Sequence, residues 1–151
     1  MTDFFATMYE FFRSFYGQDL ADHLYGLNIN DTGAFDSASQ YLSVGLTMVI
    51  SSIFLALLYY KIVDSPRYSR WYHWLIVLAI AVVFNLFIGF YLPYLSWDTG
   101  KMATAVKGVI GTGNLWGFGF ANAILSLFWF FAASLIFKQR WVSTNCATSP
   151  F

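Results

Sequence analysis

The fold is decided by residues 111–137, which read GTGNLWGFGFANAILSLFWFFAASLIF. From residue 118 to residue 137 this stretch contains no charged side chain. A helix rises about 1.5 Å per residue, so this part alone crosses the roughly 30 Å hydrocarbon core of a bilayer. Lys138 and Arg140 follow it, and Trp141 suits the membrane interface, where tryptophan is enriched. The stretch therefore predicts a membrane-spanning helix.

Two further segments share this character. Residues 41–60 carry no charge and are followed by Lys61, and residues 71–95 are also uncharged when His73 is neutral. Membrane-spanning barrel strands would be about ten residues long with alternating polarity, a pattern that none of these runs shows. We predict an all-α membrane protein with three transmembrane helices, preceded by an amphipathic, aromatic-rich N-terminal helix.

The composition supports a bilayer environment. Hydrophobic residues make up 58% of the chain and charged residues 11%, against about 25% charged residues in soluble domains. The formal net charge is zero, so no basic field attracts nucleic acid, and we expect no nucleic-acid partner. The single cysteine excludes an intramolecular disulfide and a CxxC metal or redox site.

We divide the chain into an amphipathic N-terminal region (1–36), a three-helix transmembrane domain (37–141) and a polar tail (142–151). The predicted spans are 37–63, 71–95 and 114–137, and a capping box places the first start near Ser37. A short interfacial helix is expected in the linker around Met102, Val106, Val109 and Ile110.

The N-terminal region shows apolar residues at helical spacing. They are Phe4, Phe5, Met8, Phe11, Phe12, Phe15 and Tyr16, and the other face holds Asp3, Thr7, Glu10, Arg13 and Ser14. A helix of this kind lies in the membrane interface or packs on the protein's own helices, and both interpretations stay open.

The distribution of lysine and arginine predicts the orientation. One side of the membrane would hold Lys61, Arg67, Arg70, Lys138 and Arg140, and the other Arg13, Lys101 and Lys107. Positive residues favour the cytoplasmic side, so we predict an external N-terminus and a cytoplasmic C-terminus in a plasma or inner membrane, with the reverse orientation as the alternative. The first residues, MTDFF, carry no positive charge, and we expect no cleaved signal peptide.

Small and polar residues recur every fourth position in each span, which places them on one helical face. They are Ser43, Thr47 and Ser51; Ala81, Asn85 and Gly89; and Gly113, Gly117, Ala121, Asn122 and Ser126. These stripes either pack against other helices or line a polar conduit, and a conduit requires an oligomer because three helices enclose no pore. An unpaired amide in lipid is costly, so we expect Asn85 to bond Asn122 or a hydroxyl of the first span.

Candidate chemistry is sparse. Asp19 and His23 are four residues apart, a spacing that can hold a metal if Asp31, Asp36 or another chain adds a ligand; the alternative is an exposed acidic segment. No span contains Asp, Glu, Lys or Arg, and the sequence has neither a nucleophile elbow nor a phosphate-binding loop. We expect no cofactor, and the sequence argues against an enzyme.

The three-span, N-out and C-in plan of this small chain is similar to that of class I phage holins. The resemblance covers topology alone: the aromatic N-terminal helix and the lack of a strongly basic tail depart from it, so no residue role carries over. Two functions follow from the stripes. The first is a non-catalytic integral membrane subunit that packs with further copies or with other membrane subunits. The second is a homo-oligomeric channel or pore, holin-like or membrane-permeabilising.

Overall fold

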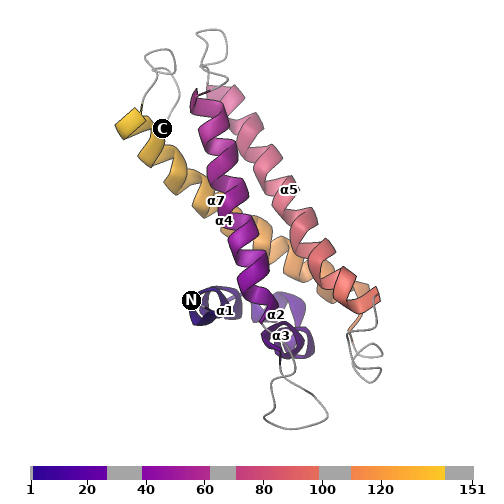
Figure 1. The fold of residues 1–151 in the computed structure, drawn as a ribbon. Helices are drawn as coiled ribbons and strands as arrows, with labels where there is room; N and C mark the ends of the chain where they lie inside the picture. Colours follow the sequence, from indigo (N-terminus) through magenta and orange to yellow (C-terminus); the bar gives the residue numbers. More distant parts are fainter. Residues whose placement is uncertain (1, 27–38, 62–70, 99–109, 142–151) are drawn as a thin grey trace. The chain divides into compact units, whose positions relative to one another are not determined.

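The protein folds into α-helices wherever its structure is described, in a computed structural model that covers residues 2–26, 39–61, 71–98 and 110–141 (Figure 1). The helices are α1 (Thr2–Glu10), α2 (Arg13–Tyr16), α3 (Gln18–Tyr25), α4 (Gln40–Lys61), α5 (Trp71–Asp98) and α7 (Thr112–Trp141). No strand occurs in these ranges. The predicted fold class, an all-α protein with an aromatic-rich N-terminal helix, is confirmed.

Three of these helices are long and apolar enough to cross a membrane: α4, α5 and α7. α4 begins at Gln40; the preceding Ser39 is not helical, and its hydroxyl donates to the Leu24 carbonyl oxygen at 3.4 Å. α5 continues past Pro93 to Asp98. The proposed cap at Ser37 and the linker helix from Met102 to Val109 lie outside the described residues, and Ile110 is not helical.

The chain separates into two compact units, and the boundaries between them fall inside the three long helices. Unit 1 comprises Met1–Thr47 and Leu86–Asn122, and unit 2 comprises Met48–Asn85 and Ala123–Phe151.

The core of unit 1 is a cluster of aromatic rings that joins the N-terminal helices to α4 and α7. The Tyr9 ring stacks on Tyr41 with centroids 5.4 Å apart and meets Phe118 at 5.0 Å. The Tyr16 ring meets Phe118 edge-on at 5.2 Å. All four side chains are fully buried. Aromatic pairs in such geometries contribute about 0.5–1.5 kcal/mol each beyond the burial of their area. In Figure 1, α1, α2 and α3 accordingly lie beside the first turns of α4.

The N-terminal region does not bury the apolar face that the sequence suggested. Phe5 and Tyr16 are buried, but Phe4, Phe11 and Phe15 are exposed. Tyr9, which was assigned to neither face, is completely buried. The region therefore has an aromatic face turned inward and a second aromatic face turned outward.

Within unit 1, α5 and α7 approach each other at two glycines. A Cβ added at Gly89 would lie 2.7 Å from the Asn122 Cβ and 3.0 Å from the Gly119 Cα. A Cβ added at Gly119 would lie 2.9 Å from the Leu86 carbonyl oxygen. Small residues of this kind let helix backbones come close in lipid, where packing rather than the hydrophobic effect holds helices together.

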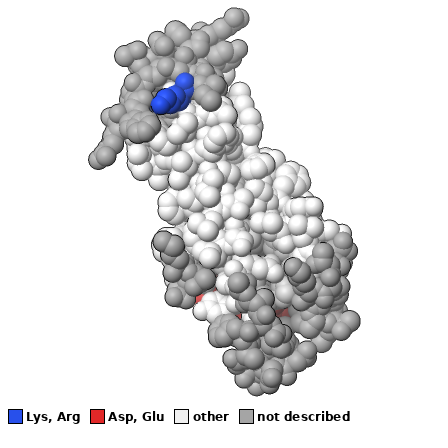
Figure 2. Space-filling model, viewed as in Figure 1, with Lys and Arg blue, Asp and Glu red and all other residues white. Residues whose placement is uncertain are grey.

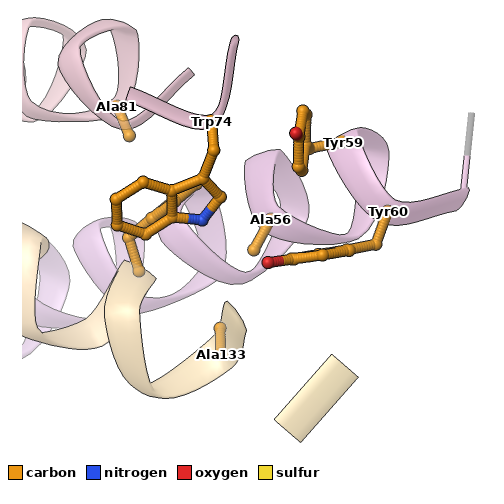
Figure 3. Close-up of a cluster of buried hydrophobic side chains, with 7 residues drawn as sticks. Ala56, Tyr59, Tyr60, Trp74, Ala81 and Ala133 are labelled. Carbon is orange, nitrogen blue, oxygen red and sulfur yellow. The ribbon is translucent and has the colours of Figure 1, made fainter. Parts of the chain in front are cut away.

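Unit 2 has its own core, in which a tryptophan meets small residues. The buried cluster contains Ala56, Tyr59, Tyr60, Trp74, Ala81, Phe130 and Ala133. Figure 3 shows Trp74 extending from α5 toward the helices that carry Ala56 and Ala133. The Trp74 indole N–H donates to the Ser134 hydroxyl oxygen at 3.2 Å. The Trp74 ring is thus both packed and hydrogen-bonded, which is the usual arrangement for a buried tryptophan.

The outward faces of the long helices are bulky and apolar. In α5 the exposed side chains include Ile76, Ile80, Phe84, Phe87 and Tyr91. Figure 2 shows a described surface that is almost entirely uncharged. Continuous apolar surface of this kind is rare on soluble monomers, so these faces are the ones that contact lipid, and the protein is an integral membrane protein.

We expect Gly89→Ala to destabilise the protein by about 1–3 kcal/mol, because overpacking forces two helices apart. Gly113→Ala is the matched control: a Cβ there meets no described atom within 4 Å, so alanine should be neutral or slightly stabilising. Thermal unfolding in mild detergent, followed by circular dichroism, compares the two. An equal midpoint for both variants would contradict the close approach at Gly89.

Candidate functional site

The polar side chains of the spans are the natural place to look for function, and most of them are buried inside their own unit. Buried polar residues among the described positions are Ser52, Asn85, Ser96, Asn122, Ser126 and Ser134. None of them ionises near neutral pH. What this set offers chemically is hydrogen bonding, either to neighbouring helices or to a ligand.

Asn85 links α5 to α4 in unit 2. The Ser51 hydroxyl lies 2.9 Å from the Asn85 Oδ1 and donates to it, and the Asn85 Nδ2 donates to the Ala81 carbonyl oxygen at 2.9 Å. A hydroxyl of the first span was one of the two partners expected from the sequence. The side chain of Asn85 is fully buried, so its amide is used for contact between helices inside the chain.

Asn122, the other partner considered for Asn85, is bonded by the N-terminal region instead. The Tyr9 hydroxyl donates to the Asn122 Oδ1 at 2.5 Å. The Tyr16 hydroxyl donates to the Tyr9 carbonyl oxygen at 2.9 Å, and the Tyr41 hydroxyl donates to the Ala21 carbonyl oxygen at 3.3 Å. Three tyrosines thus connect α1, α2, α3, α4 and α7 through polar groups at the edge of the aromatic cluster.

Burial keeps these donors protonated. It raises the pKa of the Tyr9 hydroxyl, with a further contribution from nearby Tyr16. Burial also raises the pKa of the Tyr16 hydroxyl. Both hydroxyls therefore stay protonated and remain hydrogen-bond donors at neutral pH. No sequence pattern identifies Tyr9 as a functional residue, because the asparagine that accepts its hydrogen bond is 113 positions away.

The stripe of the third span divides between different neighbours. Ala121 is buried, and the buried Ser126 hydroxyl donates to the Ala123 carbonyl oxygen at 2.8 Å. A Cβ at Gly117 would collide with the Phe15 carbonyl oxygen, so this glycine admits the backbone of α2. Gly113 is exposed. The contact with α5 is made by Gly119, which lies off the four-residue repeat and was missed for that reason.

The stripe of the first span is the exception, because much of it is uncovered. Ser43 and Thr47 are both exposed, whereas Ser51 is half-buried. The Thr47 hydroxyl donates to the Ser43 carbonyl oxygen at 2.8 Å, within α4 itself. By contrast Ala81 and Gly89 of the second span are buried. A small, hydroxyl-bearing face is therefore available on α4.

The weak metal candidates do not come together with further ligands. Among the described residues no group of three or more His, Cys, Asp or Glu side chains lies within reach of one ion, and Asp31 and Asp36 fall outside the described ranges. Asp19 is exposed. The His23 Nε2 lies 3.4 Å from the Ser96 hydroxyl oxygen and so joins α3 to α5. Burial lowers the pKa of His23.

A hollow of about 140 Å³ in unit 1 holds the remaining charged side chains of that region. Its lining is Glu10, Arg13, Ala21, Asp22, Tyr25 and Tyr41. An Arg13 nitrogen pairs with an Asp22 oxygen at 3.3 Å, and both side chains are more than a third exposed. An ion pair of this exposure contributes little to stability. The lining contains no Ser, Cys or His to act as a nucleophile or its base.

Comparison of the chain with protein-family models, curated proteins and solved structures found no match.

We predict that Tyr9→Phe lowers stability by about 0.5–1.5 kcal/mol, the usual net value of one hydrogen bond. Tyr91→Phe removes the same atom from an exposed ring of α5 and should leave the unfolding midpoint unchanged. A double-mutant cycle that combines Tyr9→Phe with Asn122→Ala measures the interaction free energy between these two side chains. If Tyr9→Phe and Asn122→Ala add without coupling, the bond does not contribute.

We also predict an acid-sensitive contact at His23. The folded state disfavours the charged imidazole, so the unfolded chain binds the proton more readily. The effect is absent above the ordinary histidine pKa of about 6.5 and grows as pH falls below it. The unfolding midpoint should therefore drop between about pH 7 and pH 5.5, and His23→Gln should drop less over the same interval. Parallel pH profiles for the two proteins would show that His23 is not responsible.

Proposed function

We propose that this chain is a non-catalytic integral membrane subunit that assembles with further copies or with other membrane proteins through the exposed Ser43–Thr47 face of α4. The observation that carries the proposal is the contrast between the stripes. The small and polar residues of the α5 stripe, and most of those of the α7 stripe, are buried by other parts of their own unit. Ser43 and Thr47 of the α4 stripe are exposed instead.

The neighbours of this face fit helix packing. Ser43 and Thr47 alternate on the exposed side of α4 with Leu46 and Ile50. Small hydroxyl residues allow a second backbone to approach closely, and the flanking aliphatic side chains fill the space around the contact. The exposed face of α5 is built from large residues instead, which suits lipid. A partner helix therefore gains most by packing on α4.

A homo-oligomeric channel or pore is the alternative, and it uses the same face. In an oligomer the Ser43 and Thr47 hydroxyls would line the conduit. The lining would carry no charge, since α4 has no ionisable side chain between Gln40 and its end at Lys61 apart from tyrosines. Such a pore would select weakly among ions, because charged rings or ordered carbonyls give channels their selectivity.

The orientation we propose has the N-terminus outside and the C-terminus in the cytoplasm of a plasma or inner membrane. The described charges support it for each unit. In unit 2 they are Lys61 and Lys138, both positive. In unit 1 they are three acidic residues, Glu10, Asp19 and Asp22, and one basic residue, Arg13. Positive residues favour the cytoplasmic side, so the ends of α4 and α7 in unit 2 belong there.

The test is the variant Ser43→Leu/Thr47→Leu, purified in mild detergent. We expect the mass of the extracted particle to fall to that of the single chain with its detergent, while helicity and the unfolding midpoint stay unchanged. Phe84→Leu, on the exposed face of α5, is the control and should retain the full assembly. An unchanged particle mass for the double variant would refute the proposed interface.

Ion flux into proteoliposomes separates the two functions. Loss of flux with an intact assembly favours the pore, and an assembled wild type without flux favours the subunit. Gly117→Ile is unsuitable for this comparison, because Gly117 contacts the backbone of α2 in the same chain. That variant reports on the packing of the N-terminal region.

A further inference from the structure

The proposed assembly through α4 leaves the exposed aromatic rings of the N-terminal region unused. Phe4, Phe11 and Phe15 are 55%, 83% and 60% exposed. Phe4 lies in α1, Phe15 lies in α2, and Phe11 lies in the short turn between these two helices. By contrast, Phe5 and Tyr9 are 7% and 0% exposed. Three exposed large rings within twelve residues favour an apolar environment.

The depth at which this region is attached indicates which environment it has. Phe5 fills the space beside Gly45, five residues into α4, and the Phe15 backbone contacts Gly117, five residues into α7. Tyr9 bonds Asn122, ten residues into α7. At about 1.5 Å per residue these contacts lie roughly 7 to 15 Å inside the helix ends.

Helices α4 and α7 exceed the hydrocarbon thickness by only a few residues at each end. A span of Thr112–Lys138 is about 40 Å long, against a core of about 30 Å. The excess at each end is thus about 5 Å, less than the depth of the Phe5, Phe15 and Tyr9 contacts. The outward rings of α1 and α2 therefore reach the level of the acyl chains.

Charged residues occur in each of the three N-terminal helices, and His23 of α3 lies near an end of α5. Asp22 pairs with Arg13, and His23 meets Ser96, close to the end of α5 at Asp98. The described charges of α1–α3 are Glu10, Asp19 and Asp22 against Arg13, an acidic excess. Attraction to anionic lipid therefore cannot hold the region at the membrane.

We infer that Phe4, Phe11 and Phe15 form a lipid-contact surface by which α1 and α2 lie embedded at the acyl-chain boundary of the bilayer, held by apolar contact without any need for anionic headgroups. Trp116 and Phe120 of α7, in the same unit, are exposed as well. This inference rests on the spans and not on the subunit proposal. On this inference the buried rings of Phe5 and Tyr9 pack on the protein's own helices, while the exposed rings contact lipid. Both interpretations of the N-terminal helix then hold, each for a different set of rings.

The experiment places a spin label at residues 4, 11 and 15, one at a time, by Phe→Cys substitution in a Cys146→Ser background. The labelled protein is reconstituted in vesicles of zwitterionic phosphatidylcholine, and power saturation compares collisions with oxygen and with a water-soluble nickel chelate. Phe120→Cys is the lipid reference and Asp19→Cys the water reference, since both positions are exposed. Circular dichroism confirms that each labelled variant keeps its helices.

We expect labels 4, 11 and 15 to collide several-fold more with oxygen relative to nickel than label 19 does, and to match label 120. The ratio should not change when phosphatidylglycerol is added. Three results would each overturn the inference: nickel access equal to that of label 19, low collision with both reagents because another protein surface covers the rings, or a lipid-like ratio that appears only with anionic lipid.

Discussion

The whole structure depends on one constraint: in lipid, a polar group has to find its partner inside the protein. Hydrogen bonding to water is absent there, so an unpaired amide or hydroxyl is costly. The long helices satisfy their backbones, and the deep asparagines are satisfied by side chains from other elements. Asn85 takes the Ser51 hydroxyl, and Asn122 takes the Tyr9 hydroxyl. Each bond fixes a relation between two helices that apolar side chains alone would leave free to slide.

Close approach of backbones is the second consequence of the same environment. Because lipid chains are as apolar as leucine, helices gain by fitting together and not by leaving water. The glycines at 89 and 119 bring α5 and α7 together, and Gly117 accepts the backbone of α2. Unit 2 reaches a similar fit in another way, with Trp74 set against alanines and bonded to Ser134.

The sequence alone predicted the spans well and their contacts only in part. Length and absence of charge locate membrane helices because those two properties follow directly from the bilayer thickness. The residues that the four-residue repeat places on one face of the second span, Ala81, Asn85 and Gly89, are each buried. It could not reveal Tyr9 or Gly119, since periodicity indicates which side of a helix is small but not which element lies against it. The same limit hid the division of the N-terminal aromatics into an inner and an outer face.

The position of the charges restricts what the spans can do by themselves. In the described parts of α4, α5 and α7, ionisable acids and bases lie only at or near helix ends, and the deep amides of Asn85 and Asn122 are hydrogen-bonded within the chain. Proton relays and coupled transport rely on ionisable groups within the membrane, so a transport role for this chain would have to arise between subunits. The Ser43–Thr47 face of α4 offers polar groups to such a neighbour, because both side chains are exposed. The Thr47 hydroxyl donates to the Ser43 carbonyl oxygen within α4 and remains accessible. Assembly through α4 is consequently the step on which either proposed role depends.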